Sequence, residues 1–179
     1  HTYFATLPGM KDRTVMCNSL SKTYSITGWR LGYVCAPAYV MDRVRKVHDF
    51  LTVGAAAPLQ EAVIAGLELP DSYYQGVRDL FTHRKNIFCK GLDEIGLKYY
   101  EPQGTYFVMV DIGEFGYESD YDFCIELARD VKVGAVPGSS FFKEPVNNYI
   151  RLHFAKSDET LHEALNNLSK IREIIKIKK

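Results

Sequence analysis

The stretch that decides how this sequence is interpreted lies between two strand-like runs and reads Ser19-Leu20-Ser21-Lys22-Thr23-Tyr24-Ser25-Ile26-Thr27-Gly28-Trp29-Arg30-Leu31-Gly32. Small hydroxyl residues flank Lys22, and Arg30 follows eight positions later. An aldehyde needs an amine to hold it as an imine, and lysine supplies one. A phosphate needs hydroxyls, backbone N–H groups and a fork-shaped guanidinium. The stretch therefore suits a phosphorylated aldehyde, although these residues alone leave open an ordinary polar turn with a solvated arginine.

The composition is that of an electrically neutral globular chain. Of its 179 residues, 46% are hydrophobic and 13% are aromatic, which is enough for one core or for a core and part of a second. Lys+Arg and Asp+Glu both number 22, so charge gives no case for a nucleic acid or an anionic membrane as partner. No apolar run reaches the roughly 18 residues of a membrane span.

The start of the sequence suggests a piece of a longer protein. The first residue is His1 rather than Met, and no signal peptide is recognisable there. The Lys-rich residues 176–179 are expected to form a solvated end.

Neither the cysteines nor the five histidines show the spacing of metal ligands, so no metal site is predicted. The cysteines are expected to be buried, reduced thiols, which favours a soluble cytoplasmic protein. They are Cys17, Cys35, Cys89 and Cys124.

Strand-like runs rich in Val, Tyr, Phe and Ile alternate with helical runs along the chain, and this alternation predicts an α/β protein. Strands are expected at Thr14–Asn18, Leu31–Ala36, Tyr106–Asp111, Val133–Val136 and Tyr149–Phe154. Helices are expected at Tyr39–Phe50, Gln60–Leu69, Ser72–Ile95, Asp120–Arg129 and, after a cap at Ser157 or Asp158, along an apolar stripe that ends at Ile175.

The long helix Ser72–Ile95 separates two groups of strands. Asp71 or Ser72 is expected to cap its start, and Gly96 is expected to stop it. The earlier strands bracket the lysine stretch, and the later ones are expected to form a smaller α+β unit. The sequence therefore predicts part of a large domain over residues 1–70, a bridging helix over residues 71–97 and a small α+β domain over residues 98–179.

The lysine stretch matches the pattern S-x-S-K-x-[FY]-x-x-x-G-x-R-x-G at every position. This pattern strongly resembles the pyridoxal-phosphate (PLP) lysine signature of fold-type I, class I and II aminotransferases, a group that includes the aspartate, kynurenine and methionine aminotransferases. Later segments resemble the same family in order and spacing, so that the resemblance covers essentially the whole chain. These segments are Gly32–Pro37, Glu101–Phe107, Val136–Phe141 and Asn148–Ala155.

The resemblance implies roles for five residues. Lys22 would hold PLP through its amine and move the substrate proton. Ser19 and Arg30 would bind the cofactor phosphate, with Ser21 close by. Arg151 would hold the substrate α-carboxylate through two parallel hydrogen bonds; taken alone, without Lys22 and Arg30, it would be interpreted as a surface arginine at a strand edge.

The resemblance also implies that this chain is the C-terminal portion of such an enzyme. It would comprise the end of the PLP-binding large domain, with its mainly parallel sheet, and the α+β small domain. The family's Asp that pairs with the pyridine nitrogen would lie upstream, and the electron-accepting role of PLP depends on that nitrogen. The chain alone is therefore expected to be inactive. The whole protein is expected to be a homodimer, with the run Ala55–Leu59 near the partner.

Transamination is the reaction that the resemblance favours. Aspartate enzymes of the family take a second arginine from a stretch after the lysine, whereas Leu51–Pro58 here contains none. An aromatic or broad-range amino donor with 2-oxoglutarate as acceptor is therefore expected. Two alternatives stay open: a PLP-dependent C–S β-lyase, and the aminotransferase-like effector domain of a helix-turn-helix transcription regulator.

Overall fold

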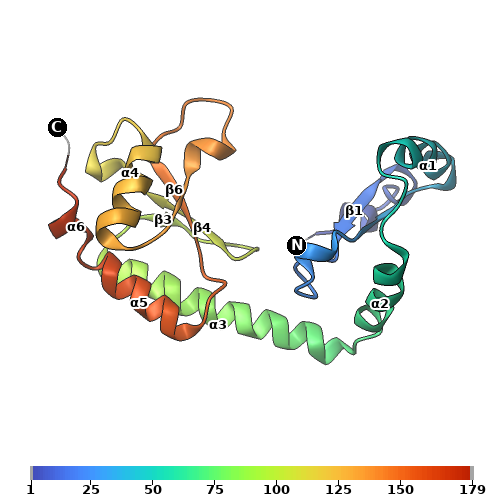
Figure 1. Ribbon diagram of the computed structural model, residues 1–179, viewed down its shortest axis with the longest axis horizontal. Helices are drawn as coiled ribbons and strands as arrows, with labels where there is room; N and C mark the ends of the chain where they lie inside the picture. Colours follow the sequence, from blue (N-terminus) through green and yellow to red (C-terminus); the bar gives the residue numbers. More distant parts are fainter. Residues whose placement is uncertain (1, 178–179) are drawn as a thin grey trace. The chain divides into compact units, whose positions relative to one another are not determined.

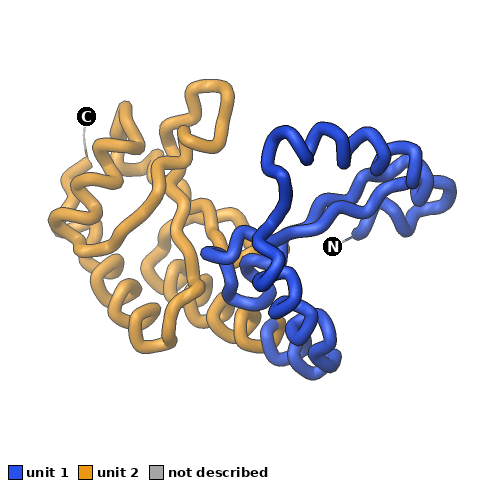
Figure 2. Tube along the Cα trace, turned by 45° about the vertical axis from the view of Figure 1, so that its right-hand side comes forward, with its two compact units in different colours: residues 1–77 blue, residues 78–179 orange. Residues whose placement is uncertain are grey.

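The computed structural model describes residues 2–177, and the chain divides into two compact units (Figures 1 and 2). The first unit is His1–Val77 and the second is Arg78–Lys179, so that the boundary falls within helix α3 (Asp71–Ile95). Of the Lys-rich end expected to be solvated, Lys178 and Lys179 lie outside the described residues. No helix within residues 2–177 has the length and apolar composition that a membrane span requires.

The first unit consists of a two-stranded sheet followed by helices. Its two strands pair antiparallel, with Ser19 opposite Gly32. In chain order the elements before α3 are η1 (Phe4–Thr6), η2 (Lys11–Arg13), β1 (Met16–Ser19), η3 (Thr27–Trp29), β2 (Gly32–Cys35), α1 (Ala38–Leu51) and α2 (Ala57–Leu67).

The α/β class is confirmed, but the parallel pairing expected for the large domain is not present between β1 and β2. The two strands run antiparallel. Parallel neighbours need a crossover connection, usually a helix, whereas the chain between these strands folds back through tight turns and the single 3-10 turn η3.

The described core of the first unit is small. Leu20, Leu31 and Val63 are buried together, and Leu59 and Ile26 pack against them. Helix α1 buries none of its residues. Phe50 at its end is 92% exposed, so much of the apolar surface of this unit is left uncovered.

The second unit contains a four-stranded antiparallel sheet in the order β3-β4-β6-β5, together with helices. In chain order the elements after α3 are β3 (Tyr99–Tyr100), β4 (Phe107–Asp111), η4 (Gly113–Phe115), α4 (Asp120–Glu126), the π-helical turn η5 (Leu127–Val131), β5 (Val136–Pro137), η6 (Gly138–Phe141), β6 (Tyr149–His153), α5 (Asp158–Leu168) and α6 (Ile171–Ile174).

The central strands β4 and β6 pair with each other, as expected for strands of one small α+β unit. Val108 lies opposite Leu152 and Val110 opposite Ile150, and all four side chains are buried. Because side chains alternate between the two faces of a strand, Arg151 is placed on the face away from this core.

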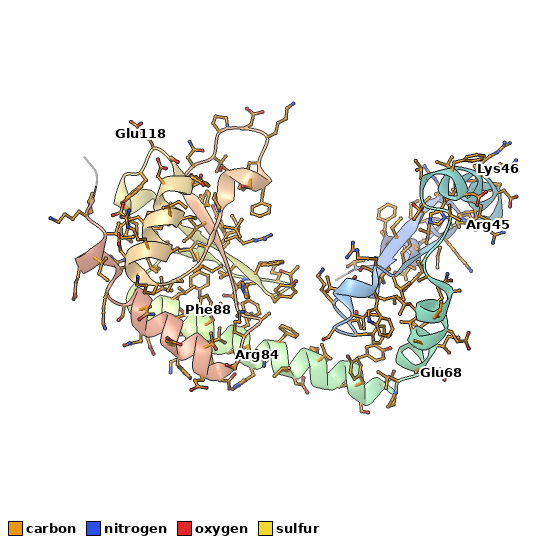
Figure 3. The ribbon with its side chains drawn as sticks, in the orientation of Figure 1. Arg45, Lys46, Glu68, Arg84, Phe88 and Glu118 are labelled. Atoms are coloured by element: carbon orange, nitrogen blue, oxygen red, sulfur yellow. The ribbon has the colours of Figure 1, made fainter. Side chains whose placement is uncertain are left out.

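Helices α3 and α5 lie side by side and close one side of this core (Figure 1). A Cβ added at Gly91 of α3 would come within 2.4 Å of the Leu165 side chain of α5, so the absence of a side chain at Gly91 allows the close approach. Phe88, labelled in Figure 3, is 2% exposed and belongs to the same core.

The end of α3 forms where the sequence predicts it. Gly96 has a φ of +75°, which a glycine adopts without strain. The Leu97 N–H donates to the Leu92 carbonyl at 3.0 Å, and the Gly96 N–H donates to the Asp93 carbonyl at 3.0 Å. These two bonds are the Schellman pattern, and the buried side chains of Leu92 and Leu97 accompany it.

The last helix starts at its predicted cap but is interrupted. The Ser157 Oγ accepts a hydrogen bond from the Thr160 N–H at 3.3 Å, as an N-cap does. The prediction of one continuous helix to Ile175 is wrong, because α5 ends at Leu168 and α6 starts only at Ile171. The apolar stripe continues across the break, and this is why periodicity alone does not reveal it.

Candidate cofactor and substrate site

The loop that carries Lys22 is closed at its base by the pairing of β1 with β2. Ser19 lies opposite Gly32, and the Leu20 N–H donates to the Leu31 carbonyl at 3.2 Å, which extends the ladder by one step into the loop. Leu20 and Leu31 are buried in the core of the first unit. The two ends of the loop are therefore fixed both by backbone hydrogen bonds and by apolar packing.

Inside the loop, Ser21 is the residue on which the turns close. It is 4% exposed. Its carbonyl accepts hydrogen bonds from the Ile26 N–H at 2.9 Å and the Thr27 Oγ at 3.3 Å, and its own N–H donates to the Ser19 Oγ at 3.2 Å. Ser21 thus shapes the loop, whatever contact its hydroxyl makes with a ligand.

Two cationic side chains project from this closed loop. Lys22 is exposed, and its amine makes no hydrogen bond or ion pair with any residue from 2 to 177. One guanidinium N–H group of Arg30, at Nη1, donates to the Thr27 carbonyl at 3.0 Å, which orients the side chain. Its other N–H groups make no hydrogen bond to the described residues, so they are available to an anion.

The backbone at Arg30 is strained. Its φ is +57°, and Ser25 in the same loop has a φ of +56°. The left-handed conformation costs a non-glycine residue roughly 1–2 kcal/mol. Such strain persists where the surrounding contacts enforce it, and it concentrates at ligand-binding positions. At Arg30 the enforced turn places the arginine two residues before Gly32, the residue of β2 that pairs with Ser19.

Three tyrosines connect the lysine loop to the start of helix α3. The Tyr73 hydroxyl donates to the carbonyl of Thr23, the residue after Lys22, at 2.6 Å. The Tyr24 ring stacks on Tyr73, and its hydroxyl shares a 2.8 Å hydrogen bond with that of Tyr74. This bond, together with burial, raises the pKa of Tyr24 to about 12, so that Tyr24 stays protonated near neutral pH.

Adding one methyl group at Gly32 should separate the strands at the base of the loop. A Cβ there would lie 2.6 Å from the backbone oxygen of Asn18, which cannot move aside without opening the β1–β2 ladder. We expect Gly32→Ala to destabilise the whole protein by about 1–3 kcal/mol, the usual cost of overpacking, as measured by urea unfolding. Gly28→Ala in the same loop is the matched control, because a Cβ at Gly28 would meet no atom within 4 Å. Equal stability of the two variants would contradict this account of the loop base.

Arg151 lies in the second unit, on β6, and two aromatic rings hold its guanidinium. Its Cζ is 4.0 Å from the ring centroid of Phe107 and 4.2 Å from that of Phe141. Among residues 2–177 the guanidinium has no hydrogen-bonding or ion-pairing partner. Rings on a guanidinium contribute roughly 0.5–2 kcal/mol each and restrict its plane without using its N–H donors. The arrangement suits a carboxylate that approaches along the edge of the guanidinium.

His153, two residues along the same strand, is uncharged near neutral pH. Its side chain is exposed, but partial desolvation lowers its pKa, and the nearby charges of Lys156 and Arg151 lower it further. An anion that binds here would therefore be drawn by the arginine rather than by the histidine.

The four cysteines divide into two pairs. Cys89 and Cys124 are buried as expected, and burial raises the pKa of both thiols, that of Cys124 to about 11. Cys17 and Cys35 are exposed, which corrects the expectation that all four are buried. They lie on β1 and β2, whose faces are largely uncovered in this chain. Within the described part of the chain, no group of three or more His, Cys, Asp or Glu side chains could hold a metal ion.

Sequence reasoning places Ser19, Ser21, Lys22 and Arg30 in one stretch, and the structure brings them together around one loop of the first unit. Arg151 belongs to the second unit. Sequence reasoning gave no role to three aromatic residues that shape these sites: Tyr73, Phe107 and Phe141. Both phenylalanines stand in segments that resemble the family, which was the available signal.

A family model described as aminotransferase class I and II matches residues 2–168. The chain belongs to this family. Among curated relatives, the probable N-succinyldiaminopimelate aminotransferase DapC of Mycobacterium tuberculosis is 33% identical over 183 residues, which cover 97% of this chain and 46% of that protein. The methionine aminotransferase of Escherichia coli is 34% identical over 172 residues, covering 96% of this chain and 45% of that protein. The kynurenine–oxoglutarate transaminase of Dictyostelium discoideum is 31% identical over 195 residues, covering 97% and 45%.

Solved aminotransferase structures share the fold. The structure of YbdL from Escherichia coli, identified as a methionine aminotransferase, superposes with a TM-score of 0.88 at 34% identity and covers 95% of this chain and 45% of that one. The N-succinyldiaminopimelate aminotransferase of Mycobacterium tuberculosis gives a TM-score of 0.84 at 35% identity, covering 92% and 44%. The chain therefore spans about half the length of the aminotransferases that it matches.

Proposed function

We propose that the whole protein is a PLP-dependent aminotransferase whose cofactor is anchored by Lys22. The observation that carries this proposal is the lysine loop itself. The pairing of β1 with β2 closes the base of this loop, Lys22 is exposed on it, and Ser19 and Arg30 lie at its two ends. The amine of Lys22 and most N–H groups of the Arg30 guanidinium have no hydrogen-bonding partner among the described residues.

The residues of the loop fit a phosphorylated aldehyde. The amine of Lys22 is the group that an aldehyde requires, and the guanidinium of Arg30 with the hydroxyl of Ser19 is a donor set for phosphate. Gly32 has no side chain to fill the space beside Asn18, so that the backbone pairs closely next to Ser19. Bound PLP supplies the electron-accepting ring that makes the substrate Cα–H acidic.

Each residue then has a separate task. Lys22 would hold the cofactor covalently and, when released by the substrate amine, would carry the proton from the substrate Cα. Arg30 and Ser19 would fix the phosphate end, with Ser21 supporting them from the loop interior. Arg151 would bind the α-carboxylate along the open edge of its guanidinium.

An aromatic or broad-range amino donor with 2-oxoglutarate as acceptor fits best. Leu51–Pro58 carries no arginine to bind a second carboxylate of the donor. Relatives named as a methionine aminotransferase and as a kynurenine–oxoglutarate transaminase support the same range. The proposal places an apolar side chain, rather than a carboxylate, next to the cofactor.

The test uses the whole protein with PLP, phenylalanine or methionine, and 2-oxoglutarate. We expect glutamate and the matching 2-oxo acid at a rate of about 1–10³ per second, the usual range for enzymes. Residues 1–179 alone should give no glutamate above background, because this chain spans under half of its relatives and the Asp that would pair with the pyridine nitrogen is expected upstream of it. With an S-substituted cysteine as the only substrate, release of pyruvate, ammonia and the thiol would instead indicate a C–S β-lyase. Turnover by residues 1–179 at the rate of the whole protein would show that the site is wrongly assigned.

A further inference from the structure

The second unit contains a buried carboxylate that takes no part in the proposed chemistry. Asp120, the first residue of α4, is 2% exposed. It accepts hydrogen bonds from the Ser139 N–H at 2.6 Å and from the Ser139 Oγ at 2.8 Å. A buried carboxylate is costly unless it is well bonded, and bonds of this kind are short and strong. Ser119, the residue before it, supplies the N-cap of α4, so Asp120 is free to bond elsewhere.

The two bonds join the turn η6 to the start of α4, and β6 holds the turn as well. Val136 and Pro137, just before the turn, pair with Arg151 and Ile150 of β6. A Cβ added at Gly138 would lie 2.5 Å from the backbone oxygen of Tyr149, so the turn is pressed directly against the strand. The turn therefore has little freedom to shift relative to Arg151.

Phe141 ends this turn, two residues after Ser139, and its ring lies over the Arg151 guanidinium. Phe141 is itself 47% exposed, so burial does little to hold it. The turn holds Phe141 in place, and the turn is itself held by its pairing with β6 and by the two hydrogen bonds to Asp120. Within residues 2–177, no hydrogen bond or ion pair joins Asp120 to Arg151.

We propose that Asp120 is a positioning residue for Arg151, acting through Ser139 and the ring of Phe141, and that it thereby sets the affinity of the enzyme for the substrate carboxylate. The inference rests on the proposed function, in which Arg151 binds that carboxylate. It adds a specific mechanism: the orientation of the guanidinium depends on a hydrogen-bonded turn and not on a counter-charge.

Substitutions at Asp120 and Ser139 can separate the effect of the hydrogen bonds of Asp120 from the effect of its negative charge. In Asp120→Asn, the amide oxygen can accept from the Ser139 N–H while the amide N–H donates to the Ser139 Oγ, because a hydroxyl is both donor and acceptor. Asp120→Ala breaks both bonds, and Ser139→Ala breaks only the bond from the hydroxyl. The three variants thus remove the charge alone, both bonds, or one bond.

The experiment measures the dissociation constant of the whole protein for glutarate, an unreactive analogue of the proposed acceptor, together with KM and kcat for the amino donor. Asp120→Ala should weaken glutarate binding and raise KM about tenfold, which corresponds to about 1.4 kcal/mol, with kcat nearly unchanged. Ser139→Ala should weaken both about threefold, and Asp120→Asn should stay close to the wild type. Ser139→Ala keeps the proposal testable if Asp120→Ala does not fold.

A double-mutant cycle separates positioning from general stability. If Asp120 acts through the ring, Asp120→Ala should add little to the effect of Phe141→Ala. Additive effects of the two substitutions, or a loss in kcat with unchanged KM and glutarate affinity, would overturn the inference. If Arg151→Ala leaves glutarate binding unchanged, both the assignment of Arg151 as the carboxylate-binding residue and this inference are wrong. If Arg151→Ala weakens binding and Asp120→Ala does not, only the inference fails.

Discussion

Replacing Lys22 with alanine in the whole protein should abolish covalent attachment of PLP and nearly all transamination. Within residues 2–177, Lys22 is the amine that stands exposed on a loop with Ser19 and Arg30 at its two ends. Positioned proton transfer alone contributes about 10²–10⁴-fold to a rate. The loss of the covalent attachment of PLP should lower the rate of transamination further. Reduction with borohydride followed by mass spectrometry would locate the attachment, and glutamate release would measure the activity.

Two controls make this result specific. Lys22→Arg keeps a positive charge at the same place but offers a guanidinium, which is a poor nucleophile, so it should be as inactive as the alanine variant. Lys11→Ala removes another exposed lysine of the first unit and should behave as the wild type. Cofactor attachment at another lysine, with turnover kept in Lys22→Ala, would refute the central assignment.

Replacing Arg151 with alanine should mainly raise KM for the amino donor. The loss of a paired, desolvated charge costs about 2–5 kcal/mol, which corresponds to a rise in KM of about 30- to 5,000-fold. The attachment of PLP at Lys22 should be unaffected, since Arg151 belongs to the other unit. Steady-state kinetics across donor concentrations would give KM and kcat separately.

Arg151→Lys tests whether the planar, forked shape of the guanidinium matters in addition to its charge. Lysine keeps the charge, but it cannot make two parallel hydrogen bonds or lie as a plane between Phe107 and Phe141. We expect its KM to fall between those of the wild type and the alanine variant. An unchanged KM in Arg151→Ala would place the carboxylate site elsewhere.

The sequence predicts helices better than short strands. Apolar periodicity places α1 and α3 within one residue of their observed bounds, and Gly96 ends α3 as predicted, although the residues predicted to cap its start, Asp71 or Ser72, lie within the helix. β3 was not predicted, because Tyr99–Tyr100 is too short to form a pattern. β5 was expected at Val133–Val136, yet only Val136 and Pro137 pair with β6. Pairing of such short strands is decided by their neighbours, which a local pattern does not contain.

The candidate site also contains a part that the sequence predicts and a part that it does not. The lysine loop could be predicted because its hydrogen bonds join residues that are close in the sequence, such as Ser21 with Ile26. The surroundings of Arg151 could not, because Phe107 reaches it across the β4–β6 pairing and Phe141 reaches it from η6. The bonds from Ser139 to Asp120 also depend on tertiary contacts. No periodicity or local motif encodes contacts of this kind.

The antiparallel pairing of Ser19 with Gly32 also has a consequence for the entropy of forming the site. The chain between β4 and β6, from Asp111 to Tyr149, is roughly three times as long as the lysine loop, so its closure costs about 1 kcal/mol more. After a local opening, the cofactor loop therefore closes at a smaller entropic cost than the sheet that carries Arg151. The loop that carries Lys22 is thus thermodynamically the easier one to restore, whereas the strand pairing that carries Arg151 depends on the return of a much longer segment of the chain.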